Sequence, residues 1–338
     1  MQQIQRPTIA LTLGDAAGIG AELIAKLIDK IKDTSDAHVI LVGDTWLWEQ
    51  GQKLASTHIE LPIIDSFEDA KKQPDVYFLP VQSIDAALVH HGEVNAACGK
   101  AVLDVLRLCL DAAKNNEIDA ICFAPLNKNA MKLGGLNFDD ELHFFADYLG
   151  VDGYFCEFNT LGSIWTSRIS SHIPLKDVSQ WVTQERILAA SKLMYSSLQN
   201  AGIAQPRIAV AAFNPHGGDG GLCGREEVET IIPAVQELNK QGYPIAGPFP
   251  ADTIFLKVRD GHYDAVVTMY HDQGQIAIKL LGFEKGVTVQ GGLPVPITTP
   301  AHGTAFDIAG QGKANVEATY QAYQIAKRMA NTVVLNRT

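Results

Sequence analysis

The strongest constraint on the fold of this chain is a regular alternation of short apolar runs with segments of helical periodicity. Residues 8–13 are rich in aliphatic and β-branched side chains, which is typical of a buried strand. A glycine-rich turn follows, and residues 21–31 then carry apolar side chains at helical spacing. The same alternation returns at residues 38–42, 76–79, 98–113 and 118–123. Strands that alternate with helices in this way predict an α/β fold with a largely parallel sheet.

The second half of the chain continues this alternation and ends on a predicted helix. Helical spacing covers residues 138–148, 185–198 and 316–329, and strand-like runs cover residues 164–169, 208–213 and 265–269. The sequence has no internal repeat and no long linker. Its 338 residues correspond to about two domains. We therefore expect two domains that share a sheet or exchange segments.

Composition and charge narrow the class of protein. Hydrophobic residues make up 46% of the chain, which is enough for a large core and argues against intrinsic disorder. The formal net charge of −11 argues against a nucleic-acid binder, because neutralising phosphates requires a basic face. An anionic small substrate is still compatible with this charge, since a few local cations can dominate a cleft.

The sequence predicts a soluble cytoplasmic protein without disulfides and without a membrane anchor. Residues 1–7 are polar and lack the apolar stretch of a signal peptide. No apolar run approaches the roughly 20 residues that a membrane helix needs. The cysteines are scattered without a C-x-x-C pair, which argues against a disulfide framework or a thiolate zinc site and favours small buried side chains. They are Cys98, Cys109, Cys122, Cys156 and Cys223.

Three histidines stand at the ends of apolar segments and are flanked by turn residues. They are His172, His216 and His271. Neutral imidazole is a common ligand of zinc and related metals, and three protein ligands leave a position open for substrate. Each histidine taken alone is more often a structural residue of the core or of a loop. Their wide spacing is also unlike a local metal motif, so the residues themselves are weak evidence for a metal site.

Two loops are rich in glycine and short polar residues. Residues 14–20 match neither the G-x-G-x-x-G fingerprint nor a Walker loop, so a structural turn in which Asp15 caps the next helix is the simpler interpretation. Residues 299–315 are dense in His, Gly, Thr and Asp, which are residue types that approach ligands closely. Composition alone does not separate a ligand loop from a plain connection before the last helix.

Seven ordered motifs, taken together, resemble the 4-hydroxythreonine-4-phosphate dehydrogenase (PdxA-like) family almost end to end. They are LGDAAGIGAE at 13–22, SHIPL at 171–175, NPHGGDGG at 214–221, GREE at 224–227, PADT at 250–253, MYHDQG at 269–274 and HGTAFD at 302–307. The last motif is also similar to the adenine-binding stretch of isocitrate and isopropylmalate dehydrogenases. The resemblance implies their two-domain α/β fold, with mixed sheets and helices on both faces, and a homodimer with its active site at the interface.

The resemblance also implies that the two domains have different functions. Residues 1–131 with 286–338 would form the cofactor-side domain, and residues 132–285 would carry the metal, the substrate and the dimer contact. The cofactor would be NAD or NADP, bound by a loop in the first of these domains. The residues expected in this loop are His302, Gly303, Thr304, Ala305 and Asp307.

Members of this family oxidise a hydroxyl group β to a carboxylate, and the β-keto acid then loses CO2. By resemblance, His172, His216 and His271 match three metal ligands, the third of which comes from the partner subunit in that family. A divalent metal held in this way favours the alkoxide and polarises the ketone. Zinc is the first expectation, with cobalt, nickel, manganese or magnesium as alternatives, because imidazoles accept several of these metals.

Three further polar residues are candidates for catalysis. Lys279 matches the substrate-binding lysine of the family, and a cation suits a substrate carboxylate or phosphate. Asp252 and Asp272 lie beside the matched ligands in sequence and are candidates for orienting a histidine or a water molecule. Both aspartates could equally be structural carboxylates in hydrogen-bonded turns.

The substrate end departs from the family pattern. Glu141 and Leu142 stand where the family has His and Thr, and His143 is a neighbour that could reach the same space. Thr288 replaces an Asn, and Ile297 replaces an Arg that would anchor an anion bidentately. These changes predict a substrate other than 4-hydroxythreonine 4-phosphate. A related sugar-acid phosphate or an unphosphorylated diol acid, such as a cis-dihydrodiol carboxylate, fits them better.

Two other interpretations stay open at this point. The chain could be an authentic 4-hydroxythreonine-4-phosphate dehydrogenase of vitamin B6 synthesis with compensating contacts. It could also be a catalytically silent homologue that keeps the fold and the metal. Retention of three histidines and Lys279 argues against the silent homologue.

Overall fold

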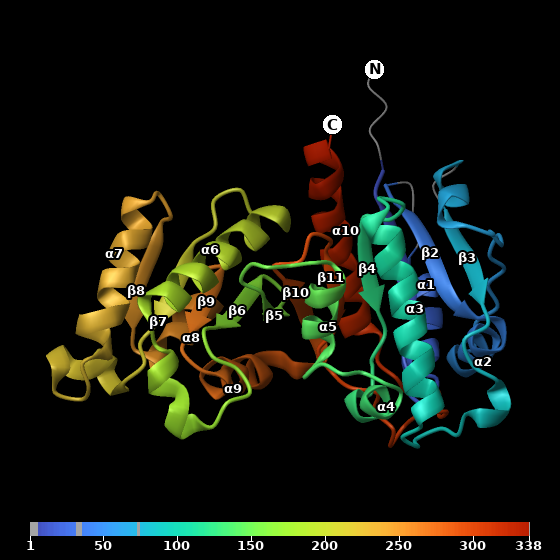
Figure 1. The fold of residues 1–338 in the computed structure, drawn as a ribbon, viewed down its shortest axis with the longest axis horizontal. Coiled ribbons are helices and arrows are strands. Elements are labelled where there is room, and N and C mark those ends of the chain that lie inside the picture. Colours follow the sequence, from blue (N-terminus) through green and yellow to red (C-terminus); the bar gives the residue numbers. More distant parts are fainter. Residues whose placement is uncertain (1–5, 32–35, 73–74, 338) are drawn as a thin grey trace. The chain divides into compact units, whose positions relative to one another are not determined.

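The computed structural model describes residues 6–31, 36–72 and 75–337. The chain forms two compact units, residues 1–151 with 293–338 (unit 1) and residues 152–292 (unit 2). Each unit contains β-strands covered by helices (Figure 1), which confirms the predicted α/β class. The polar residues 1–5, part of the stretch expected to carry no signal peptide, lie outside the described residues.

The described residues of unit 1 form five parallel strands in the order β3 (Val76–Val81), β2 (His38–Asp44), β1 (Thr8–Thr12), β4 (Ala120–Phe123) and β11 (Ile297–Pro300). Its α-helices are α1 (Gly20–Lys30), α2 (Thr45–Ala55), α3 (Ala96–Lys114), α4 (Lys128–Leu133), α5 (Glu141–Tyr148) and α10 (Glu317–Arg337). The core between strands and helices is apolar. Leu103 and Leu106 of α3 lie in it, and burying such a side chain contributes roughly 1.5–3 kcal/mol.

Unit 2 contains a mixed set of strands in the order β10 (Gly286–Gly291), β5 (Cys156–Leu161), β6 (Ile164–Arg168), β9 (Ala265–Thr268), β7 (Ile208–Ala211) and β8 (Ile245–Phe249). β10, β5 and β6 pair antiparallel, whereas β6, β9, β7 and β8 pair parallel. The α-helices are α6 (Gln184–Asn200), α7 (Ile232–Lys240), α8 (Ala251–Arg259) and α9 (His271–Gly282). Parallel strands bring their carboxyl ends to one edge, where open α/β sheets place ligands.

The unit boundaries differ from the expected ones, which lay at residues 131 and 285. Unit 1 extends to residue 151 because Phe144 and Phe145 of α5 pack in its apolar core. Unit 2 extends to residue 292 because β10 forms an antiparallel ladder with β5. The functional labels given to the two parts remain predictions.

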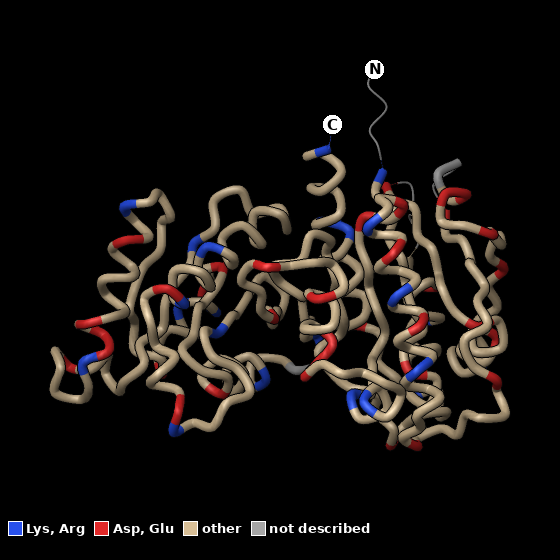
Figure 2. Tube along the Cα trace, viewed as in Figure 1, with Lys and Arg blue, Asp and Glu red and all other residues tan. Residues whose placement is uncertain are grey.

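Other expectations concern the cysteines, the charges and membrane spans. All five cysteines are free, and Cys98, Cys109 and Cys122 are buried, as expected for small core side chains. Acidic and basic residues are interspersed along the described parts of both units (Figure 2). Within the described residues, every helix is too short or too polar to cross a membrane.

Candidate functional site

Two of the three predicted metal histidines lie close together in unit 2. His172 follows β6, and His271 is the first residue of α9, directly after the loop that leaves β9. Their ring centroids are 5.7 Å apart with an angle of 43° between the planes. β6 and β9 are parallel neighbours, so the segments that leave their carboxyl ends start from the same edge. The structure therefore brings the imidazoles of His172 and His271 together at the carboxyl ends of β6 and β9.

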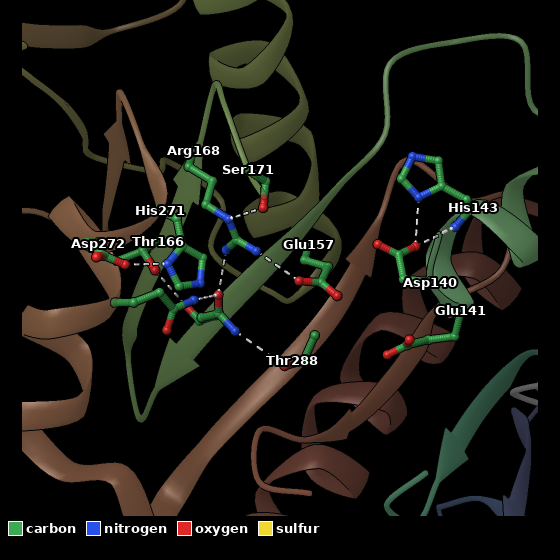
Figure 3. Close-up of polar contacts among 12 residues, drawn as sticks. Asp140, Glu141, His143, Glu157, Thr166, Arg168, Ser171, His271, Asp272 and Thr288 are labelled. Carbon is green, nitrogen blue, oxygen red and sulfur yellow. Dashed lines mark hydrogen bonds and ion pairs between the residues drawn. The ribbon is translucent and has the colours of Figure 1, made fainter. Parts of the chain in front are cut away.

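Asp272 contacts the second of these histidines. Its Oδ1 lies 2.7 Å from Nδ1 of His271 (Figure 3). A carboxylate on one ring nitrogen fixes the tautomer and the orientation of the imidazole, and it leaves the other nitrogen as the metal donor. This geometry fits the predicted orienting role of Asp272, although its side chain is 70% exposed.

His216 lies in a short turn, residues 215–221, whose backbone has an unusual conformation. The φ angle of His216 is +55°, and that of His172 is +42°. Such left-handed values are uncommon outside glycine and cluster at functional sites. Glu227, which is buried, holds the start of this turn because its Oε1 accepts the N–H groups of Phe213 and Asn214 at 2.8 and 2.7 Å.

The donor set on one chain fits a metal only in part. Across the described ranges, no group of three or more His, Cys, Asp or Glu side chains is placed to hold an ion. His172 and His271 form a pair, and His216 does not complete it within the chain. Two tilted imidazoles are suitable donors for a divalent transition metal, which would need further ligands.

Arg168 is the centre of a polar cluster, which Figure 3 shows near His271. It is the last residue of β6 and only 6% exposed. Its Nε donates to Oγ of Ser171 at 2.9 Å, and its Nη2 donates to Oε2 of Glu157 at 2.8 Å. Because Ser171 precedes His172, this buried cation fixes the segment that carries the first imidazole.

Asn159 connects the same cluster to two other elements. Its Oδ1 accepts from Nη1 of Arg168 at 2.8 Å and also from Nε2 of Gln275 in α9. Its Nδ2 donates to Oγ1 of Thr288 in β10 at 3.2 Å. The cluster thus joins the helix that begins with His271 to the predicted substrate residue on β10.

The remaining predicted catalytic residues are exposed. Lys279 lies in the last turn of α9, on the helix that begins at His271. Asp252 lies in the first turn of α8, and α8 contacts the turn that contains His216. No finding assigns a catalytic role to either residue, so both roles remain predictions.

The predicted substrate residues of unit 1 are held by charged neighbours. Asp140 caps α5, and its Oδ1 lies 3.0 Å from the backbone N of His143 and 2.7 Å from its ring Nδ1. Burial raises the pKa of Asp140, but the His143 contacts and the charge of Lys128 outweigh it, so this pKa is lower than usual. Lys128 also lies 3.5 Å from Oε2 of Glu141, which offsets part of that carboxylate's charge.

Leu142 and Ile297 are both buried. Leu142 is 3% exposed, and Ile297 is fully buried in the apolar core of unit 1, where it pairs with Ile121 of β4. A fully enclosed side chain presents no surface to a ligand. Any influence of Ile297 on substrate would therefore act through the position of β11.

The predicted cofactor loop packs on the glycine turn of unit 1. The carbonyl oxygen of Thr304 accepts the N–H of Ile19 at 3.2 Å. A Cβ atom on Gly18 would lie 2.9 Å from the Thr304 side chain, so this close approach requires glycine. Ala305 has a φ of +45°, and His302 and Asp307 lie in the same connection between β11 and α10. Direct contact with a nucleotide remains a prediction for these residues and Gly303.

A partly buried ion pair on α1 fixes the far end of this loop. Lys26 Nζ donates to Oε1 of Glu22 at 2.7 Å and to the carbonyl oxygens of Gly312 and Ala314 at 3.1 and 2.8 Å. The N–H of Ala314 donates to the same oxygen of Glu22 at 2.7 Å. Glu22, which belongs to the first of the family motifs, therefore has a structural role in this unit, because it holds the end of the loop.

Asp15 does not cap α1, contrary to expectation. Its Oδ1 accepts the N–H of Ala17 at 2.9 Å, inside the turn that precedes the helix, and the helix begins at Gly20. The side chain is almost fully buried. Burial raises the pKa of Asp15 to about 6, although the N–H of Ala17 opposes the shift.

Analysis of the sequence did not identify the polar cluster around Arg168. Arg168 and Asn159 lie inside or at the end of strand-like segments, and their partners come from other strands and from α9. The only available signal was the presence of charged and amide residues within a predicted buried sheet. Such residues need partners when they are buried.

Comparison with known proteins identifies close relatives. The family model described as "Pyridoxal phosphate biosynthetic protein PdxA" matches residues 35–326. A protein of Pseudomonas aeruginosa named "Putative 4-hydroxythreonine-4-phosphate dehydrogenase 2" is 49% identical over 96% of this chain and 97% of its own length. A protein of Oceanobacillus iheyensis named "Putative D-threonate 4-phosphate dehydrogenase" is 36% identical over 95% of this chain and 98% of its own.

Solved structures show the same fold. A 4-hydroxythreonine-4-phosphate dehydrogenase of Klebsiella pneumoniae is similar with a TM-score of 0.84 and 34% identity, over 98% of this chain and 100% of its own. A terephthalate 1,2-cis-dihydrodiol dehydrogenase of Burkholderia xenovorans is similar with a TM-score of 0.68 and 26% identity, over 95% of this chain and 98% of its own. Both are similar over nearly the whole chain.

Proposed function

The chain belongs to the PdxA family, and from this premise we propose that it is a metal- and NAD(P)-dependent dehydrogenase of a β-hydroxy acid. A bound NAD or NADP would supply the acceptor for the hydride of the carbinol C–H bond. The hydroxyl proton passes to a base, and the β-keto acid then releases CO2 and takes up a proton at its α carbon. The observation that carries the proposal is the paired imidazoles of His172 and His271, with Asp272 behind the second ring.

Each predicted site residue has a chemical task in this proposal. A bound divalent ion would supply Lewis-acid stabilisation of the substrate oxygen. His172 and His271 would hold it, and Asp272 would orient His271. The family pattern takes His271 from the partner subunit, but here His271 pairs with His172 of its own chain, so we assign the ligand from a second copy in a homodimer to His216 instead. Lys279 would bind a substrate carboxylate or phosphate as a point charge. Asp252 would orient a water molecule.

The nucleotide is assigned to unit 1 in this proposal. The loop between β11 and α10 offers backbone groups in an unusual conformation, and Glu22 and Lys26 hold its far end in place. Fixed backbone donors and close-approaching glycines suit a dinucleotide. The contacts would come from His302, Gly303, Thr304, Ala305 and Asp307.

We propose a phosphorylated hydroxy acid other than 4-hydroxythreonine 4-phosphate as substrate. Thr288 offers a hydroxyl where the family has an amide, and buried Ile297 supplies no cation, so two anchors of the family pattern are changed. Relatives that are more than 30% identical are named for 4-hydroxythreonine 4-phosphate or for D-threonate 4-phosphate. An unphosphorylated diol acid has support only from the more distant dihydrodiol dehydrogenase.

The test is NADH or NADPH formation by the purified protein with a panel of acids. The panel contains D-threonate 4-phosphate, 4-hydroxythreonine 4-phosphate and a cis-dihydrodiol carboxylate, each with chelated and metal-reconstituted protein. We expect metal-dependent turnover, fastest with D-threonate 4-phosphate. Turnover that survives complete metal removal would contradict the metal assignment, and no turnover with any acid would favour the silent homologue.

The names of three relatives support one alternative substrate, namely 4-hydroxythreonine 4-phosphate itself. The same panel decides it. A kcat/KM of about 10⁴ M⁻¹s⁻¹ or more with that acid, in the ordinary range of enzymes, would establish the alternative.

A further inference from the structure

Apart from Thr288, the polar cluster of unit 2 has no role in the proposed function so far. We define it as Glu157, Asn159, Arg168, Ser171, Gln275 and Thr288. Three of its members are almost fully enclosed, with exposed fractions of 6% for Arg168, 7% for Asn159 and 9% for Thr288. A buried ion pair such as Arg168 with Glu157 is weak evidence for stability, because desolvation offsets its attraction. A positioning role explains its presence better.

The hydrogen-bond chemistry of the cluster fixes the orientation of Asn159. A guanidinium group has only donors, so the Asn159 atom that faces Nη1 of Arg168 must be the carbonyl oxygen. Nε2 of Gln275 is also a donor and faces the same oxygen. The Asn159 amino group is therefore the part that faces Oγ1 of Thr288, at 3.2 Å. This assignment follows from the partners and leaves no room for a flipped amide.

The orientation of Asn159 in turn fixes the role of the Thr288 hydroxyl. An amino group only donates, so Oγ1 of Thr288 accepts in this contact, and its own hydrogen points elsewhere. In the part of the chain that the structure describes, this hydroxyl donates to no protein acceptor. We infer that Thr288 is a hydrogen-bond donor to an ionised carboxylate of the substrate, and that Asn159 and Arg168 are positioning residues that set this polarity. The inference rests on the proposed function.

The position of the cluster supports a substrate as the acceptor. Arg168 holds Ser171, which precedes His172, and Gln275 lies one helical turn after His271. The groups that set the Thr288 hydroxyl thus also fix the two segments that carry the paired imidazoles. A carboxylate suits this place because it accepts without donating, and a hydrogen bond to a charged group is stronger than one to a neutral group.

Steady-state kinetics of the metal-loaded full-length protein with D-threonate 4-phosphate test the inference. Thr288→Val keeps the shape but removes the donor, and should raise KM about tenfold or more with a smaller change in kcat. Thr288→Ser keeps the hydroxyl and should stay near wild type. Thr160→Val is the matched control, since Thr160 is buried next to Asn159 in β5 and points to the opposite face of the strand.

A second variant separates positioning from packing. Asn159→Asp keeps the size of the side chain but offers two acceptor oxygens, so the Thr288 hydrogen should turn toward residue 159. KM should then rise as in Thr288→Val, and the double variant should be no worse than either single one. A wild-type KM in Asn159→Asp or in Thr288→Val overturns the inference, as do fully additive effects.

Calorimetric titration of the same acid into each protein keeps this test independent of turnover. The dissociation constant should rise by the same factor as KM in Thr288→Val and Asn159→Asp. If the wild-type protein binds the acid and forms no NADH or NADPH, the proposed function fails while the donor assignment is still measured. If the wild-type protein does not bind the acid, the donor assignment fails as well. Thermal melts show whether each variant is folded.

Discussion

Asp15 is a buried carboxylic acid whose charge the surrounding turn satisfies only in part. One oxygen accepts the N–H of Ala17, and the other has no hydrogen-bond partner among the described residues. Burial raises the pKa of Asp15 from 3.8 to about 6. Ionisation of this group therefore costs more in the folded chain than in the unfolded chain.

The first prediction is that Asp15→Asn stabilises the protein at neutral pH. Between about pH 4 and pH 6 the folded state keeps a proton that the unfolded state loses, so wild-type stability falls as pH rises through this window, by roughly 3 kcal/mol in all. Asparagine does not ionise, so the variant lacks this loss. Urea unfolding at both ends of the window should show a gain only at the upper end.

Asp264 supplies a control of opposite sign. Burial raises its pKa, but hydrogen bonds and the charge of Arg207 outweigh burial, so the pKa lies below the usual value. Its stabilisation is present above the usual pKa and is lost as pH falls through the lowered one. Asp264→Asn should therefore lose stability at neutral pH. An unchanged pH profile in Asp15→Asn would contradict the assigned burial effect.

The second prediction concerns the paired histidines. Asp272→Asn should weaken zinc or cobalt binding about 10- to 100-fold, because it removes the charged partner of His271. His271→Ala should bind metal still more weakly, and both variants should keep the wild-type melting curve without metal. Titration calorimetry with metal-free protein measures this. Asp260→Asn, which breaks an exposed ion pair with Arg259, is the control. Unaltered metal affinity in His271→Ala would remove this residue from the site.

At the residue scale, the sequence could indicate which side chains are candidate metal donors, but it could not indicate which side chains contact one another in the fold. His172 and His271 were candidates because each stands where an apolar segment gives way to a turn, and the structure brings them together. Arg168 was missed because its burial depends on Glu157 and Asn159, which reach it only through strand pairing. Ile297 was expected near the substrate because it matches the position of a family Arg. Its side chain instead lies in the apolar core, because strand register decides which face of the sheet a side chain occupies.

At the scale of elements, helix α1 stabilises the predicted cofactor loop through Glu22 and Lys26. The third prediction is that Glu22→Gln raises the apparent KM for the nucleotide by several-fold to about tenfold, with little change in the KM for the acid. The reason is that a charged acceptor for both Lys26 and the N–H of Ala314 is lost. Initial-rate kinetics with each substrate varied in turn measure the two constants.

The same helix offers a matched control. Lys30 forms an exposed ion pair with Glu317 at 2.6 Å, and such pairs contribute little. Lys30→Ala should therefore leave both KM values unchanged. If Glu22→Gln raises the KM for the acid as much as that for the nucleotide, the loop does not act on the nucleotide alone.

The apolar patterns predicted elements with continuous or evenly spaced apolar residues, and they missed strands in which polar residues interrupt the apolar ones. Strands β1, β2, β3, β4, β6, β7 and β9 and helices α1, α3, α6 and α10 agree with the predicted segments to within a few residues, except that α10 runs on to Arg337. β5 and β10 were missed because their sequences mix apolar residues with the polar residues of the Arg168 cluster. Helix α5 begins at Glu141 instead of residue 138 because Asp140 caps it.

At the scale of the whole molecule, the question is how three imidazoles assemble around one ion. One chain pairs His172 with His271, and His216 completes no group with them in the described residues. The proposed homodimer solves this if His216 of a second copy faces the pair. Isologous dimers repeat every interface site twice, so a mixture of two defective variants can report the arrangement.

The last prediction follows from that symmetry. His172→Ala and His216→Ala should each be inactive alone, but refolding or subunit exchange of an equal mixture should recover about one quarter of wild-type activity, since half the dimers are mixed and each mixed dimer keeps one intact site of two. Pairing His172→Ala with His271→Ala is the control and should recover nothing, because both changes then damage the same two-imidazole set. Recovery should also depend on metal. If the first mixture stays inactive while affinity capture through a tag on one variant also retains the untagged variant, His172 and His216 serve the same chain's site, and the shared-site arrangement is wrong.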